Sequence, residues 1–143
     1  MNTDQKQLLS GLNEDLAYEY QAVVMYNTYA ASIVGPYRKE LEDFFRAEIP
    51  DEVRHAEFLG NKITALGGHP TTRIPEVRLP ENTRGMLEEV MKAESDTIER
   101  YSHRRKQAEE IGDFALVNDL EDIISEEARH KEQTAKLLRG SWN

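Results

Sequence analysis

The chain has 143 residues, 38% of them hydrophobic, which suits a single domain (residues 1–143) with a modest core and excludes a multidomain enzyme. It contains no cysteine, which excludes disulfides, thiolate metal sites and a cysteine nucleophile. Asp and Glu number 27 against 18 Lys and Arg, and the net charge of −9 disfavours binding to nucleic acid or to an anionic membrane. Because the N-terminus lacks the apolar run of a signal peptide and no segment reaches the ~18 apolar residues of a membrane span, we expect a cytoplasmic protein.

Four segments rich in Glu, Leu, Ala, Lys and Arg follow one another, separated by glycine and proline at Gly35-Pro36, between residues 67 and 80, and at Gly112. The predicted helices run over residues 4–33, 37–66, 84–111 and 113–138. In each helix, apolar residues recur at spacings of three and four and form one inward stripe, which acids or histidines interrupt. The pattern predicts an all-α protein.

The segment between the second and third predicted helices contains Pro70, Pro75 and Pro80, which forbid a regular helix and favour extended backbone. About 14 extended residues reach roughly 46 Å, enough to run the length of a ~27-residue helix. Since the other two connections are short, we expect an up-down-down-up four-helix bundle with one long crossover. The alternative is a disordered linker between two helical hairpins.

Two copies of the motif Glu-x-x-His, at Glu52–His55 and Glu127–His130, each place both side chains on one helix face. A single copy is weak evidence, but these two belong to an internal repeat with an offset of 75 residues. The same offset also relates a lone glutamate, a tyrosine and the acid that precedes each motif. The matched pairs are Glu19/Glu94, Tyr26/Tyr101, Asp51/Glu126, Glu52/Glu127 and His55/His130.

Folding the two hairpins brings Glu19, Glu94 and both motifs to similar depth near mid-bundle. Four carboxylates with two neutral imidazoles carry a charge of −4, and each unpaired buried ion costs several kcal/mol. Two divalent cations neutralise that charge, and an oxygen-rich site with one imidazole per metal suits Fe(II) or Mn(II), with Zn(II) as a possible substitute. The alternative is a polar bundle seam with structural histidines.

This ligand set resembles that of the ferritin-like superfamily, with a spacing closest to bacterioferritin over residues 8–138 and Leu12-Asn13-Glu14 as a first-helix signature. The resemblance implies a di-iron centre with Glu52 and Glu127 as bridges, Glu19 and Glu94 as terminal ligands, and His55 and His130 one per iron. It also implies that Asp51 and Glu126 hold the imidazole of the opposite motif. Tyr26 and Tyr101 would hydrogen-bond the terminal carboxylates, as in rubrerythrins.

Three departures from these families alter the expectations. Val53 occupies the position of the bacterioferritin methionine that ligates haem, so we predict no haem. Ferritin shells use a short fifth helix and only 13 residues follow His130, which argues against a 24-subunit cage. Thr97 replaces a rubrerythrin carboxylate and the chain has no cysteine, which excludes a full rubrerythrin with its rubredoxin domain.

Four further features carry weaker expectations. Glu48 lies one turn before Glu52 and is either an auxiliary iron site or, as we favour, an exposed acid, since its repeat mate is Ile123. Pro50 predicts a kink or π-bulge that aims the first motif, or a bend that the helix tolerates. His69 and the run 103–106, which includes Arg104, are expected to face solvent. Aromatic and apolar residues off the inner stripe either form a dimer face or widen the core: Tyr20, Met25, Tyr29 and Phe44.

The predicted function is a ferroxidase that oxidises Fe(II) with O₂ or H₂O₂, with iron storage if a shell forms. One alternative is a rubrerythrin-like enzyme that reduces peroxide without a rubredoxin domain, and another is a non-catalytic metal-binding module. The resembling families pair subunits along the first two helices, so we expect a homo-oligomer that is at least a dimer.

Overall fold

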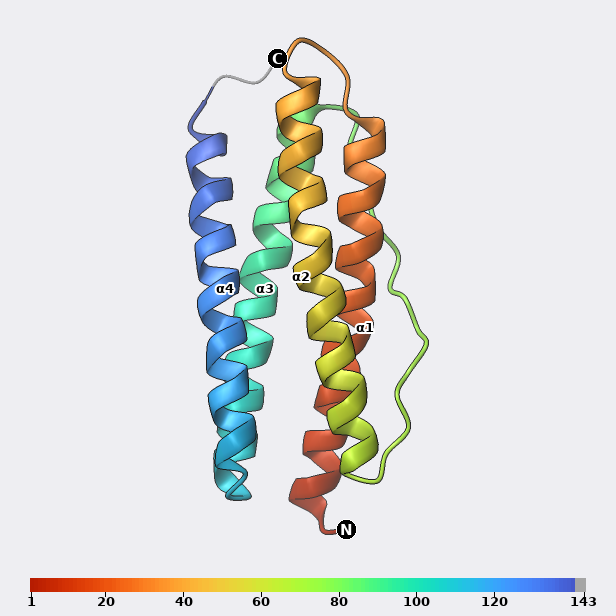
Figure 1. The fold of residues 1–143 in the computed structure, drawn as a ribbon, viewed down its shortest axis with the longest axis vertical. Helices are drawn as coiled ribbons and strands as arrows, with labels where there is room; N and C mark the ends of the chain where they lie inside the picture. The colour runs from red at the N-terminus through yellow and green to blue at the C-terminus, as the bar shows by residue number, and fades with distance from the viewer. Residues whose placement is uncertain (141–143) are drawn as a thin grey trace.

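The computed structural model describes residues 1–140 and consists, over that range, of four α-helices without a strand (Figure 1). They are α1 (Thr3–Ser32), α2 (Arg38–Ala65), α3 (Thr83–Glu110) and α4 (Phe114–Leu138). α1 and α4 run in one direction and α2 and α3 in the other, so the predicted up-down-down-up bundle is confirmed (Figure 1). None of these helices is long and apolar enough to cross a bilayer.

The helix ends follow from local sequence. Asn2 caps α1 in a capping box with Gln5, and Asn82 and Asp113 accept hydrogen bonds from backbone N–H groups in the first turns of α3 and α4. The α3–α4 turn contains Gly112 at φ 79°, in the left-handed region that a residue with a Cβ rarely adopts. These signals explain why the observed bounds lie within a residue of the predicted ones.

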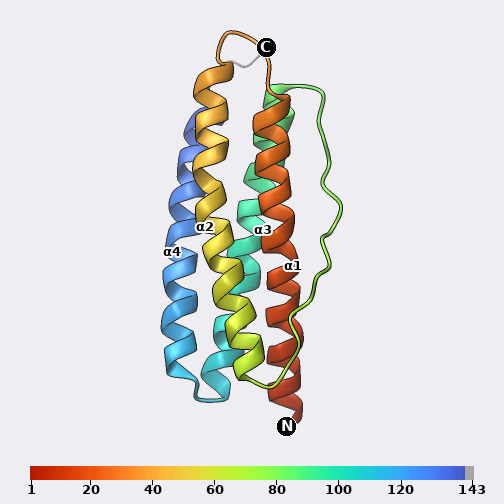
Figure 2. The ribbon, with the colours of Figure 1, turned by 45° about the vertical axis from the view of Figure 1, so that its right-hand side comes forward.

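The crossover runs along α1 over most of the helix length (Figure 2). The Asn13 amide donates to the His69 carbonyl at 3.1 Å and accepts from the Thr71 N–H at 2.8 Å. Further along, the Tyr29 hydroxyl donates to the Arg78 carbonyl at 2.6 Å. Because the segment is tied to α1 at both ends, the alternative of a disordered linker is wrong.

Two apolar clusters fill the bundle, one toward each end. The first contains Leu8, Leu12, Leu16, Ala56, Leu59, Ile63, Tyr101, Ala108, Leu116, Val117, Leu120 and Ile123. The second contains Met25, Tyr26, Tyr29, Ala30, Ile33, Leu41, Phe45, Met86, Leu87 and Val90. The carboxylate and imidazole side chains of the repeat lie between them. Met25 and Tyr29 are buried, so they widen the core, whereas Tyr20 and Phe44 remain partly exposed.

Arg104 is buried, which contradicts the expectation that its basic run faces solvent. Its Nε donates to Oδ2 of Asp15 at 2.8 Å and its Nη2 to Oδ1 at 3.2 Å, which gives a two-point ion pair between α1 and α3. Gly11 makes room for the guanidinium, because a Cβ there would lie 1.9 Å from Nη1. His69 and His103 are exposed, as expected.

Pro50 lies within continuous α-helix, and no π turn occurs around it, so the π-bulge prediction is wrong. The proline removes one backbone donor, and it lies on the exposed side of α2, where the carbonyl of Arg46 can bind water instead. The suggested role of Pro50 in aiming the motif stays a prediction.

Candidate metal centre

The six predicted ligand residues lie near the middle of the bundle and come from all four helices. Each is nearly or fully inaccessible to solvent, with His130 the most exposed at 9%. They are Glu19 on α1, Glu52 and His55 on α2, Glu94 on α3, and Glu127 and His130 on α4. Helical periodicity explains this placement, because each residue belongs to the inward stripe of its helix.

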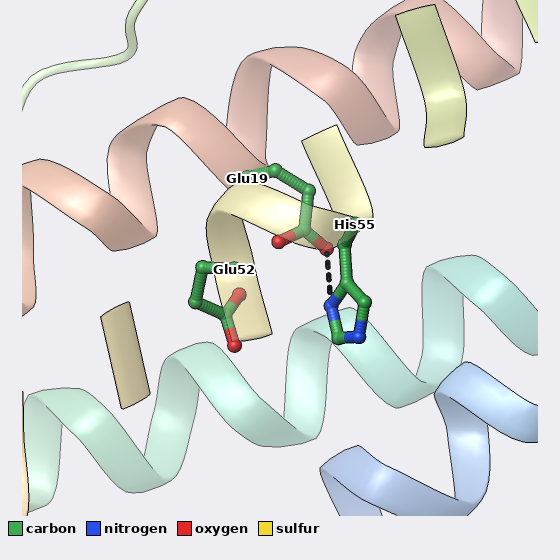
Figure 3. Close-up of side chains that lie close together, drawn as sticks. All are labelled: Glu19, Glu52 and His55. Atoms are coloured by element: carbon green, nitrogen blue, oxygen red, sulfur yellow. Dashed lines mark ion pairs between the residues drawn. The ribbon is translucent and has the colours of Figure 1, made fainter. Parts of the chain in front are cut away.

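The side chains gather in two overlapping groups. Glu19, Glu52 and His55 each offer a ligand atom within 4.8 Å of the other two, and Oε1 of Glu19 lies 3.6 Å from Nδ1 of His55 (Figure 3). Glu52, Glu127 and His130 form the second group under the same criterion. Glu52 belongs to both groups and therefore lies between them, the position that a bridging carboxylate requires.

Glu94 is buried but belongs to no such group among residues 1–140. Its Oε2 accepts a hydrogen bond from the Tyr26 hydroxyl at 3.3 Å, whereas the Thr134 hydroxyl donates to the backbone carbonyl of His130 at 3.0 Å. The corresponding contact in the other half, from the Tyr101 hydroxyl to Oε1 of Glu19, is shorter at 2.6 Å. Burial and the nearby carboxylates raise the pKa of both tyrosines, which keeps their hydroxyls protonated as donors.

Each imidazole contacts the acid that precedes the opposite motif. Nε2 of His55 lies 2.7 Å from Glu126, and Nε2 of His130 lies 3.3 Å from Asp51. A neutral imidazole whose Nε2–H faces a carboxylate has its lone pair on Nδ1, the atom that is then free to bind a metal; Nδ1 of His55 lies 3.6 Å from Glu19 and Nδ1 of His130 lies 2.6 Å from Glu48. Arg54, which the sequence analysis missed, donates from Nη2 to Asp51 at 3.0 Å and to Glu126 at 3.1 Å. Its position inside the first motif was the available signal.

Glu48 is buried at 5% exposure, so the expectation of an exposed acid is wrong. Its Oε2 lies 2.6 Å from Nδ1 of His130, and Glu48, Asp51 and His130 also offer ligand atoms within 4.8 Å of one another. The prediction of exposure relied on the apolar repeat mate Ile123. The position of Glu48 one turn before Glu52, on the inward face of α2, was the better signal.

Electrostatics make this cluster retain protons when no cation is bound. Burial, together with neighbouring carboxylates, raises the pKa of Glu127 to about 7 and that of Glu52 well above its usual value. Burial likewise raises the pKa of Glu94 to about 8. For Glu19, burial acts in the same direction, but the contacts with His55, Glu52 and Tyr101 outweigh it and lower the pKa.

Buried polar atoms without a hydrogen-bond partner test whether a cation fits this centre. Such atoms in the six residues are Oε2 of Glu19, Oε1 of Glu52, Nδ1 of His55, Oε1 of Glu94, Oε1 of Glu127 and Nδ1 of His130. A buried polar atom without a partner is costly, and of these six only Nδ1 of His130 has a close ionic contact, with Glu48 at 2.6 Å. The donors are carboxylate oxygens and imidazole nitrogens, which suit Fe(II), Mn(II) or Zn(II), so the residues fit a pair of divalent cations.

The raised pKa of Glu94 predicts how the stability of the metal-free protein depends on pH. A carboxyl whose folded pKa lies above its unfolded value gives stability that is complete below about pH 4.5 and is lost as the pH rises through about 8. Glu94→Gln cannot ionise and escapes this loss. Thermal unfolding of metal-free protein between pH 5 and 8.5 should therefore show the wild type losing stability relative to Glu94→Gln, and parallel curves would contradict the assignment.

A ferritin-like domain model matches residues 9–140. Among curated proteins, a bacterioferritin from Desulfovibrio desulfuricans is 33% identical over 120 residues, covering 83% of this chain and 67% of that protein. Another, from Streptomyces coelicolor, is 29% identical and covers 87% of this chain and 75% of its own length.

Solved structures agree with these matches. A ferritin-like, di-iron carboxylate protein from Bacillus anthracis is 47% identical with a TM-score of 0.95, covering 96% of this chain and 99% of that one. The Desulfovibrio desulfuricans bacterioferritin, described with its di-iron site in different catalytic states, has a TM-score of 0.86 at 28% identity and covers 95% of this chain and 80% of its own. Matching in sequence over nearly its whole length and in the arrangement of its four helices, the chain belongs to the ferritin-like domain family.

Proposed function

We propose that this protein binds two Fe(II) ions at the mid-bundle centre and oxidises them to Fe(III), as a ferroxidase of bacterioferritin type. The observation that carries the proposal is the set of buried carboxylate and imidazole atoms without a hydrogen bond that converge from four helices. Similarity to bacterioferritins and to a di-iron carboxylate protein supports iron as the metal.

In this proposal Glu52 and Glu127 bridge the two ions, and Glu19 and Glu94 are the terminal ligands. His55 and His130 bind one ion each through Nδ1. The position of Glu52 in both ligand groups supports its bridging role. The contacts of His55 with Glu126 and of His130 with Asp51 hold the rings in the required tautomer.

Two Fe(II) ions together supply the two electrons that convert O₂ and two protons to H₂O₂, or H₂O₂ and two protons to two waters. The chain holds the carboxylates at one point and excludes bulk water from it. Glu52, Glu94 and Glu127 release their protons when dications bind, because their raised pKa values come from burial and mutual repulsion that the cations cancel. The Tyr101 hydroxyl keeps its proton and orients Oε1 of Glu19.

Aerobic addition of Fe(II) tests the function. We expect oxidation well above the rate of protein-free buffer, with two Fe(II) consumed per chain in the first fast phase. Gel filtration of the product separates storage from turnover: a large iron-rich particle indicates a cage, and a small oligomer with precipitated iron indicates an enzyme without one. An oxidation rate equal to that of buffer would contradict the proposal.

The contacts of Tyr26 and Tyr101 with the terminal carboxylates favour a second candidate, a rubrerythrin-like peroxide-reducing enzyme without a rubredoxin domain. Reoxidation of the reduced protein at least tenfold faster by H₂O₂ than by O₂ would select it. A zinc- or manganese-loaded protein that stays inert toward both oxidants, with no turnover of iron, would select a metal-binding module.

Four further expectations belong to this proposal. Val53, which is 40% exposed on α2, lacks the thioether that binds haem, so added haem should give no thioether-ligated absorption spectrum. The protein is expected to be a homo-oligomer of at least two chains that pair along α1 and α2. The site should also accept Mn(II) and Zn(II). We further propose that the protein is located in the cytoplasm.

A further inference from the structure

A cavity of about 240 Å³ lies between α1 and α3 and is bounded on its outer side by the crossover, which runs alongside α1 (Figure 2). None of the six proposed metal ligands lines it. Ala22 and Met25 contribute to its wall from α1, Val77 from the crossover and Ala93 from α3. These apolar side chains can contact the hydrocarbon part of a small organic molecule, and the volume limits that molecule to fewer atoms than the drug-sized ligands of ~300–1,000 Å³ pockets.

Arg100 on α3 also lines this cavity and is partly buried. A guanidinium has five N–H donors, but within residues 1–140 only Thr97 accepts one of them, from Nη2 at 3.0 Å. Its Nε is buried without a hydrogen-bond partner. The guanidinium stacks on the Tyr18 ring, with Cζ 3.9 Å from the ring centre, and this contact fixes the plane of the donors. Arg100 therefore holds unused donors in a fixed orientation at the cavity wall.

The positive charge of Arg100 is also unmatched, because no carboxylate in the described part of the chain forms an ion pair with it. Asp15 interacts electrostatically with Arg100, but both of its oxygens already accept hydrogen bonds from Arg104. Asp96, another residue of the cavity wall, pairs with Lys92 at 3.2 Å. A partly buried cation without a counter-ion makes the cavity suitable for a small anion.

We propose that this cavity binds a small organic monocarboxylate, with its carboxylate on Arg100 and its hydrocarbon body against Ala22 and Met25. A guanidinium matches a carboxylate through two parallel N–H···O bonds. Glu76 and Glu89 also line the cavity and the chain carries a net charge of −9, so a dianion such as phosphate is repelled more strongly than a monoanion. The apolar wall favours a carboxylate with a hydrocarbon group over acetate. The proposal does not depend on the metal centre.

Titration of the protein with benzoate tests the site, followed by nuclear magnetic resonance of ¹³C-labelled methionine methyl groups. Met25 lines the cavity and should shift to saturation, whereas Met91 does not line it and serves as the internal reference. Acetate, inorganic phosphate and benzyl alcohol should each bind at least about tenfold more weakly, because acetate and phosphate lack the hydrocarbon body and benzyl alcohol lacks the charge. No Met25 shift with benzoate would overturn the site, and equal binding of phosphate or benzyl alcohol would overturn the choice of a carboxylate.

Arg100→Gln and Arg73→Gln form a matched pair, since each removes one positive charge and Arg73 is exposed on the crossover outside the cavity. Arg100→Gln should weaken benzoate binding by about tenfold or more through the loss of charge-assisted hydrogen bonds, whereas Arg73→Gln should stay within about twofold. Ala22→Leu fills part of the cavity, keeps every charge, and should also weaken binding by about tenfold or more.

The far-ultraviolet circular dichroism spectrum checks that each variant folds, and if Arg100→Gln does not, Ala22→Leu decides. Equal effects of the two arginine replacements, or benzoate binding that neither Arg100→Gln nor Ala22→Leu changes, would overturn the proposal.

Discussion

Glu52→Gln is expected to lower the rate of Fe(II) oxidation by more than about 100-fold, beyond the 10–100-fold that loss of an outer hydrogen-bond partner costs a metal site. Glu52 belongs to both ligand groups, so its loss removes a donor from both proposed metal positions. The same substitution should change the stability of the metal-free protein little, because an amide replaces the carboxyl closely in size and removes a group whose ionisation is disfavoured by burial and by neighbouring carboxylates, which raise its pKa.

The measurements are the initial rate of Fe(II) oxidation and the thermal unfolding temperature with and without added metal. Metal should raise the unfolding temperature of the wild type, since a ligand that binds only the folded state stabilises it, and should raise that of Glu52→Gln far less. Glu57→Gln, on the exposed face of the same helix, is the matched control and should behave like the wild type. Retention of full activity by Glu52→Gln would show that the centre does not depend on this carboxylate.

Asp15→Ala is expected to destabilise the protein by about 3–5 kcal/mol, because it leaves the Arg104 guanidinium buried without its counter-ion. The Arg104 side chain is only 5% exposed and that of Asp15 is fully buried, so water cannot replace the lost partner without opening the α1–α3 contact. Chemical denaturation should therefore show a lower midpoint for unfolding, with a slope close to that of the wild type.

Glu109→Ala is the control, since it breaks the Arg105–Glu109 pair on the exposed face of α3 and should cost less than about 1 kcal/mol. The double replacement Asp15→Leu with Arg104→Met should recover most of the lost stability, because two well-packed apolar side chains often match a buried ion pair. Equal effects of Asp15→Ala and Glu109→Ala would mean that the buried pair contributes no more than a surface pair.

The crossover and Arg104 show where sequence reasoning succeeded and where it stopped. A proline restricts the backbone wherever it occurs, because it fixes φ and lacks an N–H donor. The extended crossover between α2 and α3 could therefore be predicted from its three prolines. The charge of Arg104 led to a wrong prediction of solvent exposure, since a basic run on a helix is ordinarily solvated. Its burial depends on Asp15, 89 residues away in sequence, and on the missing Cβ of Gly11. No local pattern contains that pairing.

The sequence by itself determined the four helices, their inward stripes and the repeated ligand set, because helical periodicity and capping act over a few residues and an internal repeat can be read from numbering alone. Only the tertiary structure decided that Glu48 contacts His130, that Arg54 joins Asp51 to Glu126, and that Glu19 is gathered with its neighbours while Glu94 is not. Those outcomes depend on which side chains from different helices meet, and on the rotamers that packing and the balance of burial against charge then select.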